Sequence, residues 1–90
     1  MAFVQANLSL VAYSGNGFHI WHYTSTDAKT DIDTAGYFNA MANEMNIGDV
    51  IHANTSTGGT PEYGIFCVNA NSGTVVDVAD MVSLSGADTD

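Results

Sequence analysis

Histidines, aspartates and a single cysteine are the side chains of this sequence best suited to chemistry. His19 and His22 form an H-x-x-H pair, which on a helix could bind one metal ion. Both lie in a segment that alternates like a β-strand, where this odd spacing sends the two side chains to opposite faces. We therefore predict no shared metal site, and we expect these histidines to form hydrogen bonds in a core or at an interface.

Asp27, Asp31 and Asp33 could offer oxygen ligands to calcium, because hard cations prefer clustered carboxylates. The match to an EF-hand loop is incomplete, because Ala35 stands between Asp33 and Gly36 where a further Asp or Asn is needed, and no glutamate occupies the closing position. The pattern favours a solvated acidic connection. No metal site and no cofactor are predicted.

Nucleophilic catalysis finds little support in the sequence. Cys67 stands between Phe66 and Val68 in an apolar run, which predicts an inert, buried thiol. No G-x-S-x-G or C-x-x-C motif occurs, and the glycine-rich segment 57–60 lacks the lysine of a phosphate-binding loop. We predict no catalytic residues and no enzymatic activity.

The charge balance excludes several partners. Ten Asp and Glu residues stand against one cation, Lys29, for a formal net charge of −9. Nucleic-acid binding and attraction to anionic membranes both depend on clustered Lys and Arg, so neither partner is expected. The chain has no long apolar run and no signal-peptide pattern at its start, so we expect synthesis in the cytoplasm.

Short alternating runs separated by Gly, Asn, Asp and Ser define the expected fold class. We predict a mainly β protein, a small antiparallel β-barrel or sandwich of about six strands. Phe38, Met41, Ala42 and Met45 follow helical spacing, which predicts one short helix at about residues 35–46. The expected strands cover residues 8–13, 18–25, 49–53, 63–68, 74–78 and 81–84.

Ninety residues make one domain, predicted at 8–84, with an extended N-terminal arm at 1–7 and a flexible acidic tail at 85–90. So short a chain buries a modest core, and one cysteine cannot form an internal disulfide. The segment 18–25 carries aromatics on both faces, so we expect a neighbouring chain to cover one of them. Trp21, Tyr23 and Tyr37 are candidates for a subunit interface or for the core, with stacking on a sugar as the best small-ligand alternative.

Three blocks carry a resemblance to a known family: I-W-H-Y-T-S-T-D-A at 20–28, D-T-A-G-Y-F-N at 33–39 and I-G-D-V-I at 47–51. In this order they resemble a module of tailed-bacteriophage virion proteins, which occurs in small free-standing proteins and in head fibres. The likeness covers about residues 18–82.

The resemblance implies a β-rich capsid decoration (cement) protein on the exterior of the virion, a homotrimer whose partner is the major capsid protein. The alternative is a head-fibre or tail-fibre module that binds a host surface glycan or anchors another fibre protein. Ala2, Phe3, Val4 and Gln5 are the candidate capsid contacts, because a short uncharged arm could add a strand to a neighbouring sheet. A frayed terminus is the competing interpretation.

Overall fold

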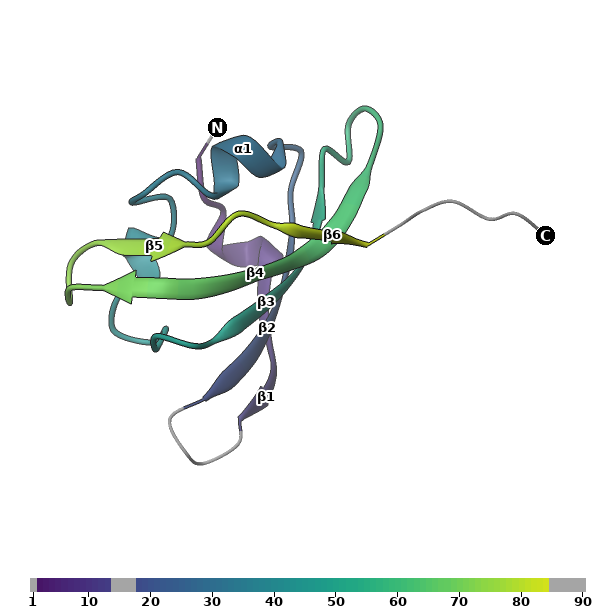
Figure 1. The fold of residues 1–90 in the computed structure, drawn as a ribbon. Coiled ribbons are helices and arrows are strands. Elements are labelled where there is room, and N and C mark those ends of the chain that lie inside the picture. Colours follow the sequence, from purple (N-terminus) through teal and green to yellow (C-terminus); the bar gives the residue numbers. More distant parts are fainter. Residues whose placement is uncertain (1, 14–17, 85–90) are drawn as a thin grey trace.

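The computed structural model describes residues 2–13 and 18–84, which form a six-stranded sheet and one short α-helix (Figure 1). The expected turn at 14–17 and the tail at 85–90 lie outside the described residues. The mainly β class, the number of strands and the single short helix confirm the expectation from sequence. The strands are β1 (Leu8–Tyr13), β2 (His19–Thr24), β3 (Val50–Thr55), β4 (Glu62–Asn71), β5 (Val76–Val78) and β6 (Val82–Leu84).

The strands follow the order β1-β2-β3-β4-β5. β6 also pairs with β4, at residues 63–65, whereas β5 pairs with residues 68–71 of the same strand. All pairs are antiparallel except β2 and β3, which run parallel and depart from the expected antiparallel arrangement. Adjacent parallel strands need a crossover connection of a dozen or more residues, and residues 25–49 supply it. The sheet is not closed into a barrel, so the sandwich-like alternative describes it better.

The helix occupies a different place from the one expected. The helix α1 spans Lys29–Ile32, whereas 35–46 forms turns with one short 3-10 segment, η2 (Asn39–Met41); a second, η1 (Gln5–Asn7), precedes β1. Tertiary hydrogen bonds explain the difference: the Gly36 N–H donates to the Val76 carbonyl, and the Asn39 side chain accepts from the Val76 N–H. These bonds fasten the crossover to β5 in a non-helical form, and Gly36 adopts a φ of 93°.

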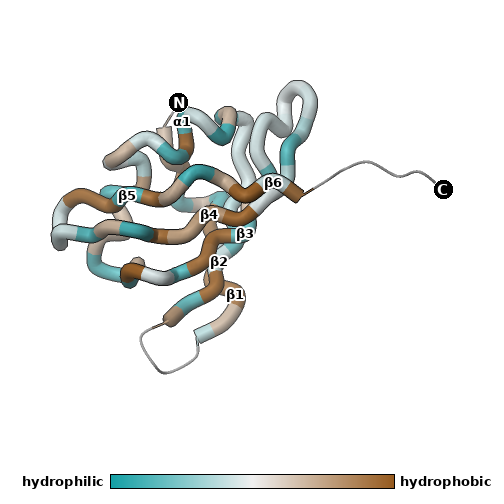
Figure 2. The backbone as a smooth tube through the Cα atoms, viewed as in Figure 1, coloured by the Kyte–Doolittle hydropathy of each residue, from teal (hydrophilic) through white to brown (hydrophobic). Residues whose placement is uncertain are grey.

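The core lies between one face of the sheet and the crossover, which with α1 lies to one side of the sheet (Figure 1). Most strongly hydrophobic segments coincide with strands (Figure 2). The apolar side chains expected to line a helix are buried even without it, because the turns present them to the sheet. The core comprises Trp21, Tyr23, Ile32, Phe38, Met41, Met45, Ile51, Ala53, Phe66, Val68, Val76, Val78 and Met81.

Gly64 allows β6 to approach β4. An added Cβ at Gly64 would lie 2.5 Å from the Val82 carbonyl oxygen and 2.5 Å from Met81 Cγ. Both distances are below any van der Waals contact, so the close packing of this part of the sheet requires glycine.

Candidate functional site

The face of the sheet opposite the core is a candidate surface for binding, and we call its part on β2, β3, β4 and β6 the outer face. Because side chains alternate along a strand, every second residue of the paired strands points away from the core. The burial pattern follows this alternation in β3 and through most of β4. Ser9 and Ala12 of β1 and the acidic Asp77 of β5 lie on the same side of the sheet, beyond this part. The outer face comprises Ile20, His22, Thr24, Val50, His52, Asn54, Tyr63, Ile65, Cys67, Val82 and Leu84.

The outer face is uncharged apart from its histidines and strongly apolar. No Asp, Glu, Lys or Arg belongs to it. Tyr63, Val82 and Leu84 remain exposed by 42%, 67% and 53%. Their side chains adjoin one another through the pairs of Tyr63 with Leu84 and of Ile65 with Val82. In globular proteins, contiguous exposed apolar areas are characteristic of sites of contact with other molecules, so the outer face is a candidate for such a site.

Two histidines lie beside each other on this face. His22 of β2 and His52 of β3 are register partners in the parallel pair, and Ile65 of β4 is the partner of His52. As expected, His19 points to the opposite face from His22. Within the part of the chain that the structure describes, no three His, Cys, Asp or Glu side chains gather closely enough to hold a metal ion. The sequence does not reveal that His52 lies beside His22, because strand pairing is a non-local property.

Cys67 also belongs to the outer face, and the expectation of a buried thiol is wrong. The side chain is exposed, and Cys67 pairs with Val50 across β3 and β4. Phe66 and Val68 point into the core, so the period of two along β4 places the residue between them outside. The alternation was the signal that could have predicted this exposure.

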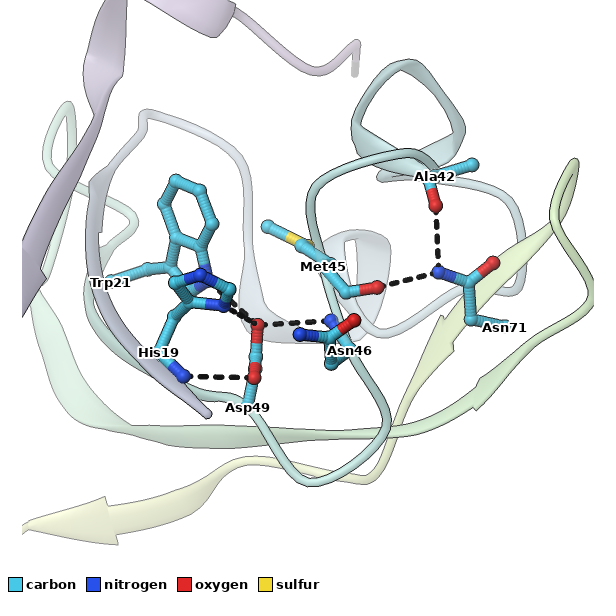
Figure 3. Close-up of polar contacts among 7 residues, drawn as sticks. All are labelled: His19, Trp21, Ala42, Met45, Asn46, Asp49 and Asn71. Atoms are coloured by element: carbon cyan, nitrogen blue, oxygen red, sulfur yellow. Dashed lines mark hydrogen bonds and ion pairs between the residues drawn. The ribbon is translucent and has the colours of Figure 1, made fainter. Parts of the chain in front are cut away.

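Asp49 forms a buried polar centre on the core side of the sheet (Figure 3). Its carboxylate is fully buried and accepts hydrogen bonds from the His19 N–H at 3.0 Å, the Trp21 Nε1–H at 3.1 Å and the Asn46 N–H at 3.0 Å. The imidazole Nδ1 of His19 lies 3.1 Å from the same carboxylate. Several donors around one buried carboxylate compensate the loss of water, so this centre fixes the end of the crossover against β2.

Asn71 holds the same end of the crossover to β4. Its side-chain amide donates to the carbonyl of Ala42 at 2.9 Å and to that of Met45 at 2.6 Å (Figure 3). These bonds satisfy carbonyls that a continuous helix would have used internally. The amide therefore takes the place of helical hydrogen bonds at the end of the crossover.

The contact between His19 and Asp49 resembles the orienting half of a catalytic triad, in which a carboxylate holds Nδ1 and leaves Nε2 for a nucleophile. The rings of Tyr13 and Trp21 pack around this imidazole, with centroids 4.9 Å and 5.6 Å from it. A shallow cleft of about 310 Å³ adjoins the centre, and its lining offers no charged or nucleophilic side chain. The arrangement fits a structural role. The lining residues are Ala42, Met45, Asn46, Ile47, Asn71 and Gly73.

The aromatic candidates lie on the core side of the sheet. Trp21 and Tyr23 are buried, and Tyr37 is half-buried. The hydroxyl groups of Tyr23 and Tyr37 lie 2.9 Å apart, and Tyr37 donates to the Asp27 carboxylate at 2.7 Å. Burial and, after it, the hydrogen bonds with Tyr23 and Asp27 raise the pKa of Tyr37. Tyr37 therefore stays protonated and can act as a hydrogen-bond donor.

The N-terminal candidates, Ala2 to Gln5, pack on the domain at this aromatic group. The ring of Phe3 stacks on Tyr23 with centroids 5.5 Å apart, and the Val4 N–H donates to the Tyr23 hydroxyl at 3.0 Å. Ala2, Val4 and Gln5 remain exposed. Their contact with a capsid stays a prediction.

Comparisons with protein-family models, with curated proteins and with solved structures found no match to this chain. Among the described residues, no helix has the length and apolar character needed to cross a membrane.

Proposed function

We propose that this chain is a structural virion protein, a capsid decoration (cement) protein that binds the outer surface of an assembled phage head and stabilises it. The observation that carries the proposal is the outer face, where exposed apolar residues adjoin one another without an Asp, Glu, Lys or Arg. The choice of the phage head as the particle and of the major capsid protein as the partner comes from the resemblance of residues 18–82 to tailed-phage virion proteins.

Burial of the outer face supplies the binding energy in this proposal. Each Å² of apolar surface removed from water contributes roughly 25 cal/mol before the costs of association. Val82 and Leu84, at the edge of the sheet, have larger exposed fractions than Tyr63. A docking protein also avoids the desolvation of charges, since the outer face carries none on Asp, Glu, Lys or Arg.

Stabilisation of the shell follows from mass action. A ligand that binds only the assembled lattice stabilises it by RT ln(1 + [L]/Kd) at each site, on the order of a few kcal/mol when sites are saturated. Repetition over many sites makes a weak individual contact sufficient. Stabilisation of this kind needs no catalytic step, so we propose a non-enzymatic protein on the exterior of the virion. Its partner is the major capsid protein, and the resemblance implies a homotrimer.

Binding to shells tests the proposal. Purified chain is mixed with expanded capsids that lack it, and the bound amount is measured after sedimentation. Val82→Asp places a charge on the outer face and should reduce binding by at least about tenfold, since an unpaired buried carboxylate costs several kcal/mol. Ile47→Asp is the matched control, because Ile47 is 66% exposed in a turn outside the sheet and Val82 is 67% exposed. Equal binding by both variants would reject the outer face as the docking surface.

Copy number in purified particles separates the proposal from its alternative. Hundreds of copies in each particle support a decoration protein, whereas a few dozen or fewer support a head-fibre or tail-fibre module. Absence from particles rejects both.

A further inference from the structure

The first strand of the sheet leaves one edge without a partner. β1 pairs with β2 on one side, and no strand among residues 2–13 and 18–84 pairs with its other side. Leu10, Val11 and Tyr13 are exposed by 52%, 61% and 63%. Proteins usually protect such an edge with charges, proline, a β-bulge or a covering segment, because its free N–H and C=O groups can pair with another strand. Of these devices, β1 has the irregular register between Leu10 and Ala12. β1 has the sequence LSLVAY, without charge or proline.

The distribution of charge favours contact between copies at this edge. All ten acidic residues lie at or after Asp27, and residues 1–26 contain no Asp, Glu, Lys or Arg. Two copies with a net charge of −9 each repel one another over most orientations. Contact through β1 brings together the part of each chain that is free of acidic side chains, so this orientation carries the least repulsion.

We propose that β1 pairs antiparallel with β1 of a second copy of this chain, and that the pair forms a two-fold dimer with one continuous sheet. An isologous contact of this type pairs the edges of both copies at once, because residue i of one copy meets residue j of the other while j meets i, and only a residue on the axis meets its own copy. The register of β1 with β2 shifts between Leu10 and Ala12, so Val11 has no partner on β2. An axis through the middle of β1 brings Val11 close to its own copy.

This dimer uses the edge of β1, whereas capsid binding uses the outer face; β1 places only Ser9 and Ala12, the partners of His22 and Ile20, on that side of the sheet. The inference revises one part of the proposed function: an isologous edge joins two copies, whereas the homotrimer implied by the resemblance requires a head-to-tail contact. Dimerisation and binding to shells are measured separately, so failure of one leaves the other standing.

Light scattering across a concentration series, with the full chain, tests the proposal. The wild type should shift from monomer to dimer as concentration rises. Val11→Lys places like charges on both sides of the axis, where facing like charges on paired strands destabilise them, and should weaken dimerisation by about tenfold or more. Ile47→Lys adds the same charge at a site of similar exposure, 66%, and should dimerise at least as well as wild type. Circular dichroism confirms that both variants are folded.

Disulfide trapping tests the register directly. Val11→Cys in a Cys67→Ser background should form a covalent dimer under mild oxidation, because the two side chains meet at the axis. Thr57→Cys in the same background lies in the loop between β3 and β4 and should remain monomeric. Three results of light scattering would overturn the proposal: a wild type that stays monomeric at its highest soluble concentration, a trimer, or association that Val11→Lys leaves intact. Absence of the disulfide-trapped dimer would also overturn it.

Discussion

The indole Nε1–H of Trp21 donates a hydrogen bond to the buried carboxylate of Asp49 over 3.1 Å. The bond joins the middle of β2 to the residue that precedes β3, although 28 positions separate the two in sequence. β2 and β3 are the parallel pair, so no tight turn can set their register. The hydrogen bonds of the buried Asp49 carboxylate instead hold β2 and β3 in register, and the alignment of His22 with His52 on the outer face depends on this register.

Replacement of Asp49 by asparagine should destabilise the domain. The amide has one accepting oxygen in place of two and adds N–H donors that face the donors of His19, Trp21 and Asn46. We expect a loss of about 2–4 kcal/mol in the free energy of unfolding, measured by urea denaturation. Glu44→Gln, at an exposed position, is the control and should change it by less than about 0.5 kcal/mol. Equal stability of the two variants would contradict a structural role for Asp49.

Gly64→Ala should disrupt the contact between β4 and β6. The new Cβ would collide with the backbone oxygen of Val82, which cannot move without displacing β6. We expect a loss of about 1–3 kcal/mol and faster hydrogen exchange in β6. Gly59→Ala is the control, because its Cβ would meet nothing within 4 Å. A Gly64 variant as stable as the Gly59 variant would argue against this close packing.

Asp33 provides a prediction of pH dependence. Partial burial, followed by repulsion from Asp80, Asp77 and Asp31, raises the pKa of Asp33 in the folded chain. A raised carboxyl pKa favours folding below the pKa of the unfolded chain, and this contribution is lost as the pH rises through the folded pKa. Ionised Asp33 therefore opposes folding at neutral pH.

Asp33→Asn should accordingly raise the melting temperature slightly at pH 7 and leave it unchanged below the ordinary aspartate pKa. The site is largely open to solvent, so the gain should stay under about 0.5 kcal/mol. Thermal unfolding of wild type and variant at the two pH values measures it. Glu44→Gln controls for net charge alone. If Asp33→Asn lowers the melting temperature at pH 7, ionised Asp33 does not oppose folding and the prediction is wrong.

Phe3→Ala should lower the stability of the domain although Phe3 lies near the N-terminus. The Phe3 ring contacts Tyr23 and lies 5.3 Å from Phe38, centroid to centroid, so its removal leaves space beside the core. We expect a loss of about 1–3 kcal/mol, less than for a fully buried phenylalanine, in urea denaturation. Gln5→Ala, at an exposed position, should have little effect. If the two variants are equally stable, the N-terminal segment is not anchored in solution.

The strands and the two faces of β2 could be predicted from sequence, because the period of two along residues 18–25 depends only on local alternation. The irregular register between Leu10 and Ala12 breaks the alternation expected along residues 8–13. The parallel pairing of β2 and β3 could not, since it depends on the path of the crossover. The helix was placed at 35–46 from the spacing of Phe38, Met41 and Met45. That spacing reports burial, and the bonds of Gly36 and Asn39 to β5 override helical propensity.

The candidate site was predictable in kind and only partly in its residues. Aromatics on both faces of the segment 18–25 predicted cover by a neighbouring chain, and that cover stays a prediction. The exposed apolar residues of the outer face lie on β4 and β6. The position of Cys67 was missed because its apolar neighbours outweighed the alternation. The pairing of His22 with His52 and the burial of Asp49 depend on contacts between distant segments, which no local pattern reports.

Alkylation of Cys67 tests the central claim most directly. Cys67 is the only cysteine of the chain and lies exposed on the outer face, so it reports whether that face is covered. The thiol should react readily in the free protein and should be strongly protected in chain bound to phage particles, with reactivity restored on dissociation. Equal rates of alkylation in the free and bound chain would contradict the claim that the outer face docks on the capsid.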